Sequence, residues 1–158
     1  MVGQITPCLW FDYQAEEAAR FYVSVFKNSS IDSISRYTAE GKEIHGQNEG
    51  TVLTVALKIN GQTFTLMNGG PLFKFNESVS FQIFCENQEE IDYYWDKLTE
   101  GGEESQCGWL KDKYGVSWQV VPTILPTLIT NSAKAEKVTK AFMQMKKFDI
   151  AKLVEASQ

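Results

Sequence analysis

The stretch FDYQAEEAARFYVSVF, residues 11–26, recurs in altered form as FCENQEEIDYYWDKL, residues 84–98, at a constant offset of 73 positions. The offset aligns residues of matching character, among them Phe11 with Phe84, Tyr22 with Trp95 and Val25 with Leu98. In both copies the apolar residues recur at i, i+3, i+4 and i+7, which predicts an amphipathic helix lying on a sheet. Such self-similarity indicates a duplicated supersecondary unit.

Strand patterns surround each predicted helix. One alternating apolar stretch precedes each helix, at residues 5–11 and 78–85, and shorter strand patterns follow it. The dipeptide Asn60-Gly61 joins two of these strands and is a strong hairpin signal, while a turn ending in Gly115 joins the last two. The order predicts an α+β protein with one domain, residues 1–122, built from two βαβββ modules at about 1–70 and 77–122.

Beyond Pro122 the pattern changes, and we expect residues 123–158 to form a helical C-terminal extension. Two prolines in PTILPTLIT exclude a central strand. Residues 132–147 have apolar side chains at helical spacing, with Ser132 as the expected N-cap. The apolar stripe needs a partner surface, either on the same chain or on a second subunit. Together with exposed sheet edges, it predicts a homodimer.

Composition narrows the classes of partner. The net charge of −5 disfavours nucleic acid, because phosphate binding needs a concentrated excess of Lys and Arg. Three widely spaced cysteines, an odd count, support neither a disulfide framework nor a metal site. With no targeting signal and no membrane-length apolar run, we expect a cytoplasmic protein without a membrane partner.

Isolated candidate residues have simpler structural interpretations. His45, the one histidine, lies in a loop-like segment and is expected to be exposed. NGGP, residues 68–71, is too short for a nucleotide-binding fingerprint and reads as a turn that ends a strand. Cys85 and Cys107 lack a neighbouring base, which favours buried structural thiols. Trp109 fits either a ligand contact or the core.

Four longer stretches resemble a known family. CLWFDYQAEEAARFYVSVF, GGPLFKFNESVSFQIFC, CGWLKDKYGVSW and AFMQMKKFDIAKL look like the PhnB-like subgroup labelled 3-demethylubiquinone-9 3-methyltransferase. That subgroup is part of the glyoxalase, bleomycin-resistance and extradiol-dioxygenase superfamily, also called the vicinal oxygen chelate superfamily. The resemblance implies a fold in which two modules curl around a cleft, where some members hold a divalent cation.

The resemblance places the four cation-ligand positions at Pro7, Thr65, Ser80 and Gln119. A proline side chain cannot ligate, and neutral hydroxyl groups are poor ligands without a carboxylate or imidazole beside them. We therefore expect no metal and no cofactor. Gln119 then becomes a neutral hydrogen-bonding anchor rather than a ligand.

The same alignment predicts the ligand-binding cleft, whose mostly apolar lining suits a flat organic molecule. Its predicted residues are Leu9, Phe11, Thr63, Thr65, Met67, Ser80, Gln82, Phe84, Ser117, Gln119 and Val121. The leading expected function is binding or transforming a small, partly aromatic or quinone-like molecule without a tightly bound metal. The alternatives are methyl transfer to a demethylubiquinone-like quinone, implied by the family label, and metal-dependent isomerase or dioxygenase chemistry. Catalytic residues cannot be assigned from the sequence.

Overall fold

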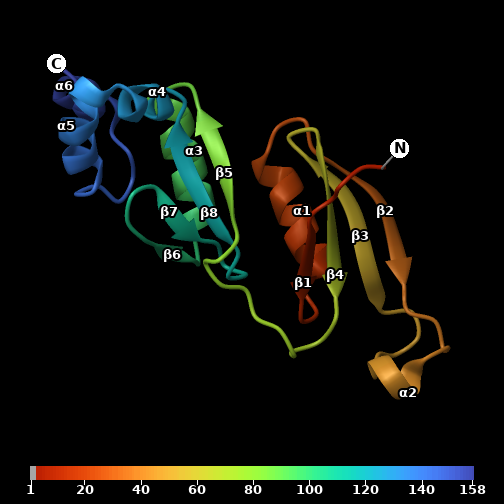
Figure 1. Ribbon diagram of the computed structural model, residues 1–158. Coiled ribbons are helices and arrows are strands. Elements are labelled where there is room, and N and C mark those ends of the chain that lie inside the picture. Colours follow the sequence, from red (N-terminus) through yellow and green to blue (C-terminus); the bar gives the residue numbers. More distant parts are fainter. Residues whose placement is uncertain (1–2) are drawn as a thin grey trace. The chain divides into compact units, whose positions relative to one another are not determined.

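The computed structural model describes residues 3–158, which form two compact units that meet in sequence between Lys74 and Phe75. Figure 1 shows that each unit contains a four-stranded sheet and a helix packed on it. The predicted α+β class is confirmed, and so is the duplicated βαβββ order. None of the helices within the described residues is both long and apolar enough to span a bilayer.

The first unit follows the predicted order, with one additional short helix. Its elements are β1 (Cys8–Phe11), α1 (Ala15–Val25), β2 (Ser30–Arg36), α2 (Lys42–His45), β3 (Val52–Ile59) and β4 (Gln62–Asn68). The sheet order is β1-β4-β3-β2, in which β1 and β4 are parallel and the other pairs antiparallel. The predicted hairpin between β3 and β4 is confirmed, because Asn60 and Gly61 both have positive φ, at 49° and 79°.

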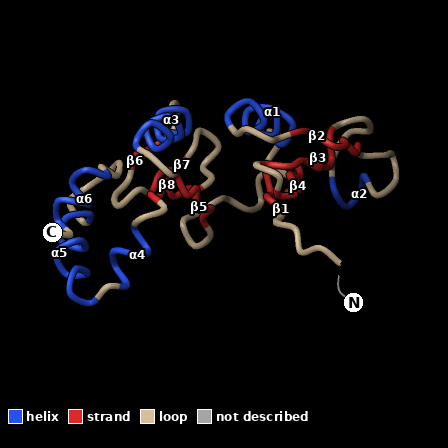
Figure 2. The backbone as a smooth tube through the Cα atoms, turned by 90° about the horizontal axis from the view of Figure 1, so that it is seen from above, coloured by secondary structure: helices blue, strands red, loops and turns tan. Residues whose placement is uncertain are grey.

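Helix α1 covers one face of the first sheet (Figure 2). Small residues on its inner side bring the helix backbone close to the strands, and the buried residues of α1 are Ala15, Ala18, Ala19, Tyr22 and Val25. At the end of β4, Asn68 joins helix to sheet. Its Oδ1 accepts a hydrogen bond from the Ala15 amide at 2.9 Å, and its Nδ2 donates to the Val52 carbonyl at 3.0 Å. This buried asparagine therefore satisfies one of the helix N-terminal amides.

The second unit repeats this plan with shorter strands and a longer C-terminal part. Its elements are β5 (Ser80–Cys85), α3 (Gln88–Thr99), β6 (Glu103–Glu104), β7 (Trp109–Lys111), β8 (Ser117–Pro122), α4 (Leu125–Thr130), α5 (Ser132–Phe142) and α6 (Ile150–Ala156). The sheet order is β5-β8-β7-β6, the counterpart of the first sheet. Figure 2 shows α3 on one side of this sheet. The helix has its N-cap at Asn87, whose Oδ1 accepts from the Glu90 amide at 2.9 Å.

A buried carboxylate shapes the turn between β7 and β8. Asp112, only 2% exposed, accepts hydrogen bonds through Oδ1 from the amides of Tyr114 and Val116, at 2.9 and 3.1 Å. Its Oδ2 accepts from Trp118 Nε1 at 2.9 Å. One side chain therefore holds the turn and orients the indole of β8 toward the face packed against α3.

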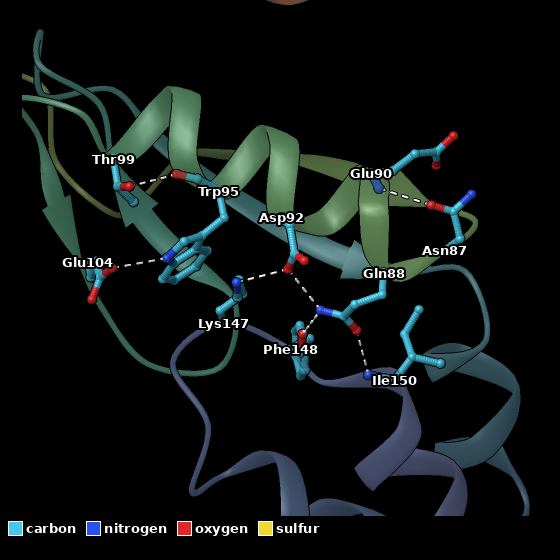
Figure 3. Close-up of polar contacts among 10 residues, drawn as sticks. All are labelled: Asn87, Gln88, Glu90, Asp92, Trp95, Thr99, Glu104, Lys147, Phe148 and Ile150. Carbon is cyan, nitrogen blue, oxygen red and sulfur yellow. Dashed lines mark hydrogen bonds and ion pairs between the residues drawn. The ribbon is translucent and has the colours of Figure 1, made fainter.

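The C-terminal extension packs on its own unit. Figure 3 shows Gln88 of α3 bonded to the segment that precedes α6: its Nε2 donates to the Phe148 carbonyl at 2.9 Å, and its Oε1 accepts from the Ile150 amide at 2.9 Å. Lys147 forms an ion pair with Asp92 at 2.8 Å. The apolar side chains Val138, Phe148 and Leu153 are buried. Part of the extension's apolar surface thus lies against the same chain.

The extension contains one helix that no sequence signal marked, and one expected N-cap is wrong. The segment with two prolines contains a helix, α4, because Pro126 stands in its first turn, where a missing amide hydrogen costs nothing. The N-cap of α5 is Asn131 rather than the expected Ser132. Asn131 Oδ1 accepts from the Ala133 amide at 3.1 Å.

Candidate functional site

The face of the second sheet that points away from α3 carries most of its polar side chains; we call it the open face of the second sheet. Strand register sets its side chains in three rows across the strands: Ser80, Ser117 and Lys111; then Gln82, Gln119 and Trp109; then Phe84 and Val121. The opposite face holds the buried Leu110, Trp118 and Val120 against α3. Trp118 therefore faces the helix, while Trp109 belongs to the open face.

A cavity of about 320 Å³ opens on this face. Its lining is Glu77, Glu103, Glu104, Ser105, Trp109, Leu110, Lys111 and Ser117. Lys111 forms an ion pair with Glu77, which lowers the pKa of the Glu77 carboxyl and raises the pKa of the lysine. On the other side, the register sets Glu103 directly opposite Lys111. The lysine thus lies beside two carboxylates.

Ser117 is the unusual residue of this cavity. It is 1% exposed, and its Oγ has no hydrogen-bond partner among residues 3–158. A buried hydroxyl group without a partner costs about 1–3 kcal/mol of stability. Because Ser117 lines the cavity, a ligand atom that reached its hydroxyl group would supply the missing hydrogen bond.

Gln119 has a partner inside the protein. Its Nε2 donates to Ser80 Oγ at 2.8 Å across the parallel pair β5–β8. The two predicted positions of the second module therefore do meet. Both side chains are half-buried, and the pair leaves the Gln119 amide oxygen as an acceptor on the open face.

The open face of the first sheet has a different character. Thr63, Thr65 and Met67 of β4 lie there half-buried, as expected. Register sets Cys8 beside Thr65 and Trp10 beside Met67. This face therefore carries hydroxyl, thiol and apolar groups and no charged residue among those five.

Leu9 and Phe11 lie on the other face of that sheet, contrary to expectation. They pair with the buried Leu66 and Asn68 under α1, and are 8% and 2% exposed. The error is one residue of register. Thr65 and Gln119 are equivalent positions in the predicted alignment, and they pair with Cys8 and Gln82, which are 74 residues apart instead of the 73 of the helix repeat. A slip of one position turns every side chain of a strand to the opposite face.

The glycine pair after β4 has a packing role. Trp10 Nε1 donates to the Gly70 carbonyl at 2.9 Å, and a Cβ added to Gly69 would overlap the indole ring. The segment after Gly70 leads to β5 without an intervening helix. The strand-to-helix turn of a nucleotide-binding fingerprint is therefore missing at these glycines.

The four positions that the superfamily uses for a cation do not fit one here. Pro7 contributes only a carbonyl, which accepts from the Thr65 amide at 2.9 Å. Ser80 and Gln119 are bonded to each other. Within residues 3–158, no three His, Cys, Asp or Glu side chains are arranged to hold a metal ion. Neutral hydroxyl and amide groups alone do not offset a divalent charge.

The remaining candidates from the sequence have structural partners. His45 lies in α2, half-buried, where Nε2 bonds the Glu40 carbonyl at 3.0 Å and Nδ1 accepts from the Gln47 amide at 2.9 Å. Cys85 is buried as expected, and burial together with the charge of Glu90 raises the pKa of its thiol to about 12. Cys107 is only half-buried.

Sequence reasoning missed Lys111, Glu103 and Glu77 as members of the site. The sequence did contain a signal for Lys111. The turn before Ser117 joins two antiparallel strands, so Lys111 on the preceding strand is the residue paired with Ser117. Strand β6 has only two residues, too few for an alternating pattern to show. Glu77 lies outside any strand or helix, so no periodicity marks it.

Comparison with known proteins agrees with the fold. The family described as 3-demethylubiquinone-9 3-methyltransferase matches residues 3–121. The PhnB protein of Bacillus cereus, which carries the same family name, is 38% identical. The match covers 77% of this chain and 100% of that chain, with a TM-score of 0.68. No curated protein matches this chain.

More distant structures share the fold. A protein from Pseudomonas aeruginosa is 16% identical over 77% of this chain and 98% of its own, with a TM-score of 0.61. The fosfomycin resistance protein FosX of Listeria monocytogenes, in complex with Mn(II) and sulfate, is 14% identical. That match covers 84% of this chain and 98% of FosX, with a TM-score of 0.56. The chain belongs to the 3-demethylubiquinone-9 3-methyltransferase family, whose PhnB-like members are part of the vicinal oxygen chelate superfamily.

Proposed function

We propose that this protein binds a small, partly aromatic or quinone-like molecule on the open face of the second sheet, without a tightly bound metal. The observation that carries the proposal is Ser117, which lines the cavity and whose buried Oγ has no partner among the described residues. Buried polar groups are almost always hydrogen-bonded in folded proteins. A bound molecule supplies the missing partner.

The neighbouring side chains suit a flat molecule. Trp109 lines the cavity and lies next to Gln119 in the sheet, so an aromatic surface adjoins a neutral acceptor. A volume of about 320 Å³ matches the lower end of known small-molecule pockets. Of the expected cleft residues, Ser80, Gln82, Phe84 and Gln119 remain our candidates beside the cavity. Thr63, Thr65 and Met67 remain candidates on the first sheet.

Native mass spectrometry of the purified protein, followed by extraction, should reveal and identify a retained organic molecule. Ser117→Ala should lower the amount retained severalfold while leaving stability unchanged or slightly raised, because it removes an unsatisfied buried hydroxyl. Ser33→Ala, at an exposed serine of β2 in the first sheet, is the matched control and should retain the molecule. Equal retention by Ser117→Ala and the wild type would exclude this site.

Elemental analysis tests the metal-free part of the proposal. We expect no stoichiometric zinc, nickel, manganese or iron, because the four cation positions lack charged ligands. A measured content of one metal ion per chain would contradict the metal-free proposal and favour metal-dependent isomerase or dioxygenase chemistry.

Methyl transfer to a demethylubiquinone-like quinone is a second candidate function, favoured by the match to the family of that name over residues 3–121. The packing role of Gly69 and Gly70 argues against a glycine-rich cofactor loop there. Titration calorimetry with S-adenosylmethionine should therefore show no saturable heat. Saturable binding at micromolar affinity would promote methyl transfer to the leading function.

We also propose a homodimer in the cytoplasm. Large apolar side chains remain exposed, among them Ile5, Leu72, Phe73 and Val79. All three cysteines are free thiols, which suits a reducing compartment. Light scattering at micromolar concentration should give the mass of two chains, and a monomer would contradict the proposal.

A further inference from the structure

The cavity on the second sheet has an unequal balance of charge. Its lining contains three carboxylates, Glu77, Glu103 and Glu104, and one ammonium group, Lys111. Lys111 is already paired with Glu77. Glu104 Oε1 accepts a hydrogen bond from Trp95 Nε1 at 3.1 Å. No described residue donates a hydrogen bond to the carboxylate of Glu103, which leaves it as the available acceptor.

From this balance we infer that the cavity takes a ligand with a positively charged amine attached to a flat ring. The inference rests on the proposed function and specifies its ligand class. A protonated amine donates hydrogen bonds only, and both Glu103 and the Ser117 hydroxyl can accept them. An anionic ligand would meet a lining with two more carboxylates than ammonium groups and is repelled.

Trp109 supports the same ligand class independently of the carboxylates. Its indole lines the cavity and lies on the open face, in the row next to that of Lys111 and Ser117. An indole face attracts a cation as well as a flat ring, and tryptophan is the strongest of the aromatic side chains in this respect. A ring carried over Trp109 with its amine toward Ser117 and Glu103 uses all three groups.

The effect of ligand charge on affinity can be measured with three probes of nearly equal shape. They are 2-phenylethylamine, 2-phenylethanol and 3-phenylpropanoate, which are positively charged, neutral and negatively charged. Their affinities are measured by titration of the ¹⁵N-labelled protein, with the Trp109 indole N–H signal as a readout at the site. We expect the amine to bind about threefold to fivefold more tightly than the alcohol, the size of effect that an exposed ion pair gives. The carboxylate should bind most weakly. Raising the salt concentration should lower the affinity of the amine only.

Glu103→Gln is the decisive variant. It should abolish the advantage of the amine and leave binding of the alcohol unchanged. Glu100→Gln, an exposed glutamate outside the cavity, is the matched control and should change neither affinity. Equal binding of amine and alcohol, or tightest binding of the carboxylate, would overturn the charge inference.

The two proposals can fail separately. If the alcohol binds and Ser117→Ala weakens it while the amine has no advantage, the small-molecule site stands and the ligand class is wrong. If none of the probes shifts the Trp109 signal at about 10 mM, a concentration at which fragments of this size bind an open pocket detectably, both proposals are wrong.

Discussion

The two units share one topology but differ in what occupies the space beside their strands. The first sheet has long strands, up to eight residues in β3, and one asparagine, Asn68, ties it to α1. In the second sheet, β6 and β7 have only two and three residues. The shortened strands leave a cavity, and a buried aspartate and the C-terminal extension hold the surrounding structure. The two copies thus share one strand order, while the short strands of the second copy border a cavity.

The largest expected contrast between the units concerns their thiols. Cys8 of the first unit is exposed, whereas burial and Glu90 raise the pKa of Cys85 to about 12. A raised pKa lowers the thiolate fraction, so at pH 8 Cys85 should react with iodoacetamide about a thousandfold more slowly than an ordinary thiol. Peptide mapping should show Cys8 alkylated first. In guanidinium both should react alike, and rapid labelling of native Cys85 would contradict its buried position.

Asp112 should matter far more than an exposed aspartate of the first unit. Asp112→Ala leaves the partly buried Tyr114 amide, the buried Val116 amide and the buried Trp118 indole N–H without their acceptor. It should lower the free energy of unfolding by about 3 kcal/mol. Asp32→Ala breaks a surface ion pair with Lys58 and an exposed hydrogen bond from Ser30 Oγ at 3.3 Å, and should cost less than about 0.5 kcal/mol. Urea denaturation compares the two, and similar costs would refute the role of Asp112 in the turn.

Gln88 tests how firmly the extension is attached. Gln88→Ala removes two hydrogen bonds to the backbone around Phe148 and should lower stability by about 1.5 kcal/mol. It should also speed proteolysis within α5 and α6. Gln62→Ala, an exposed glutamine at the start of β4, is the control. If both variants resist protease equally, other contacts hold the extension.

The smallest effect is expected at the pair Gln119 and Ser80. Each alanine variant should cost at most about 1 kcal/mol, because both side chains are half-buried. A double-mutant cycle should give a coupling energy of about 0.5–1 kcal/mol. Zero coupling would mean that the hydrogen bond contributes no stability, and that Gln119 remains available for a ligand instead.

Local patterns in the sequence predicted most of the fold. The helical stripe of residues 84–98 anticipated the buried Ile91, Trp95 and Leu98, and the turn signal Asn60-Gly61 anticipated its hairpin. Contacts between distant segments escaped prediction. Gln88 meets the backbone at Phe148 across 60 positions, and no local pattern marks that pairing.

The site was predicted less completely than the fold. Ser80, Ser117 and Gln119 lie on the expected face, because they share one sheet and one alignment. Leu9 and Phe11 lie on the opposite face. The alignment of the two copies by their helices and the alignment by their turns differ by one residue. A shift of one residue changes which face of the sheet a side chain is predicted to occupy, but it does not change the predicted order of strands and helices.

The contact between Gly108 and the C-terminal extension bears on how the chain folds as it leaves the ribosome. The amides of Cys107 and Gly108 donate to the carbonyls of Met145 and Lys146, both at 2.8 Å, and the ring of Phe148 lies where a Gly108 side chain would be. The first unit has all its strands once Asn68 has emerged, and N-terminal units generally fold first during synthesis. All strands of the second sheet have emerged once Pro122 has, but Cys107 and Gly108 lack these partners until residues 145–148 follow. The second unit therefore stays incomplete, and exposed to chaperones and proteases, longer than the first.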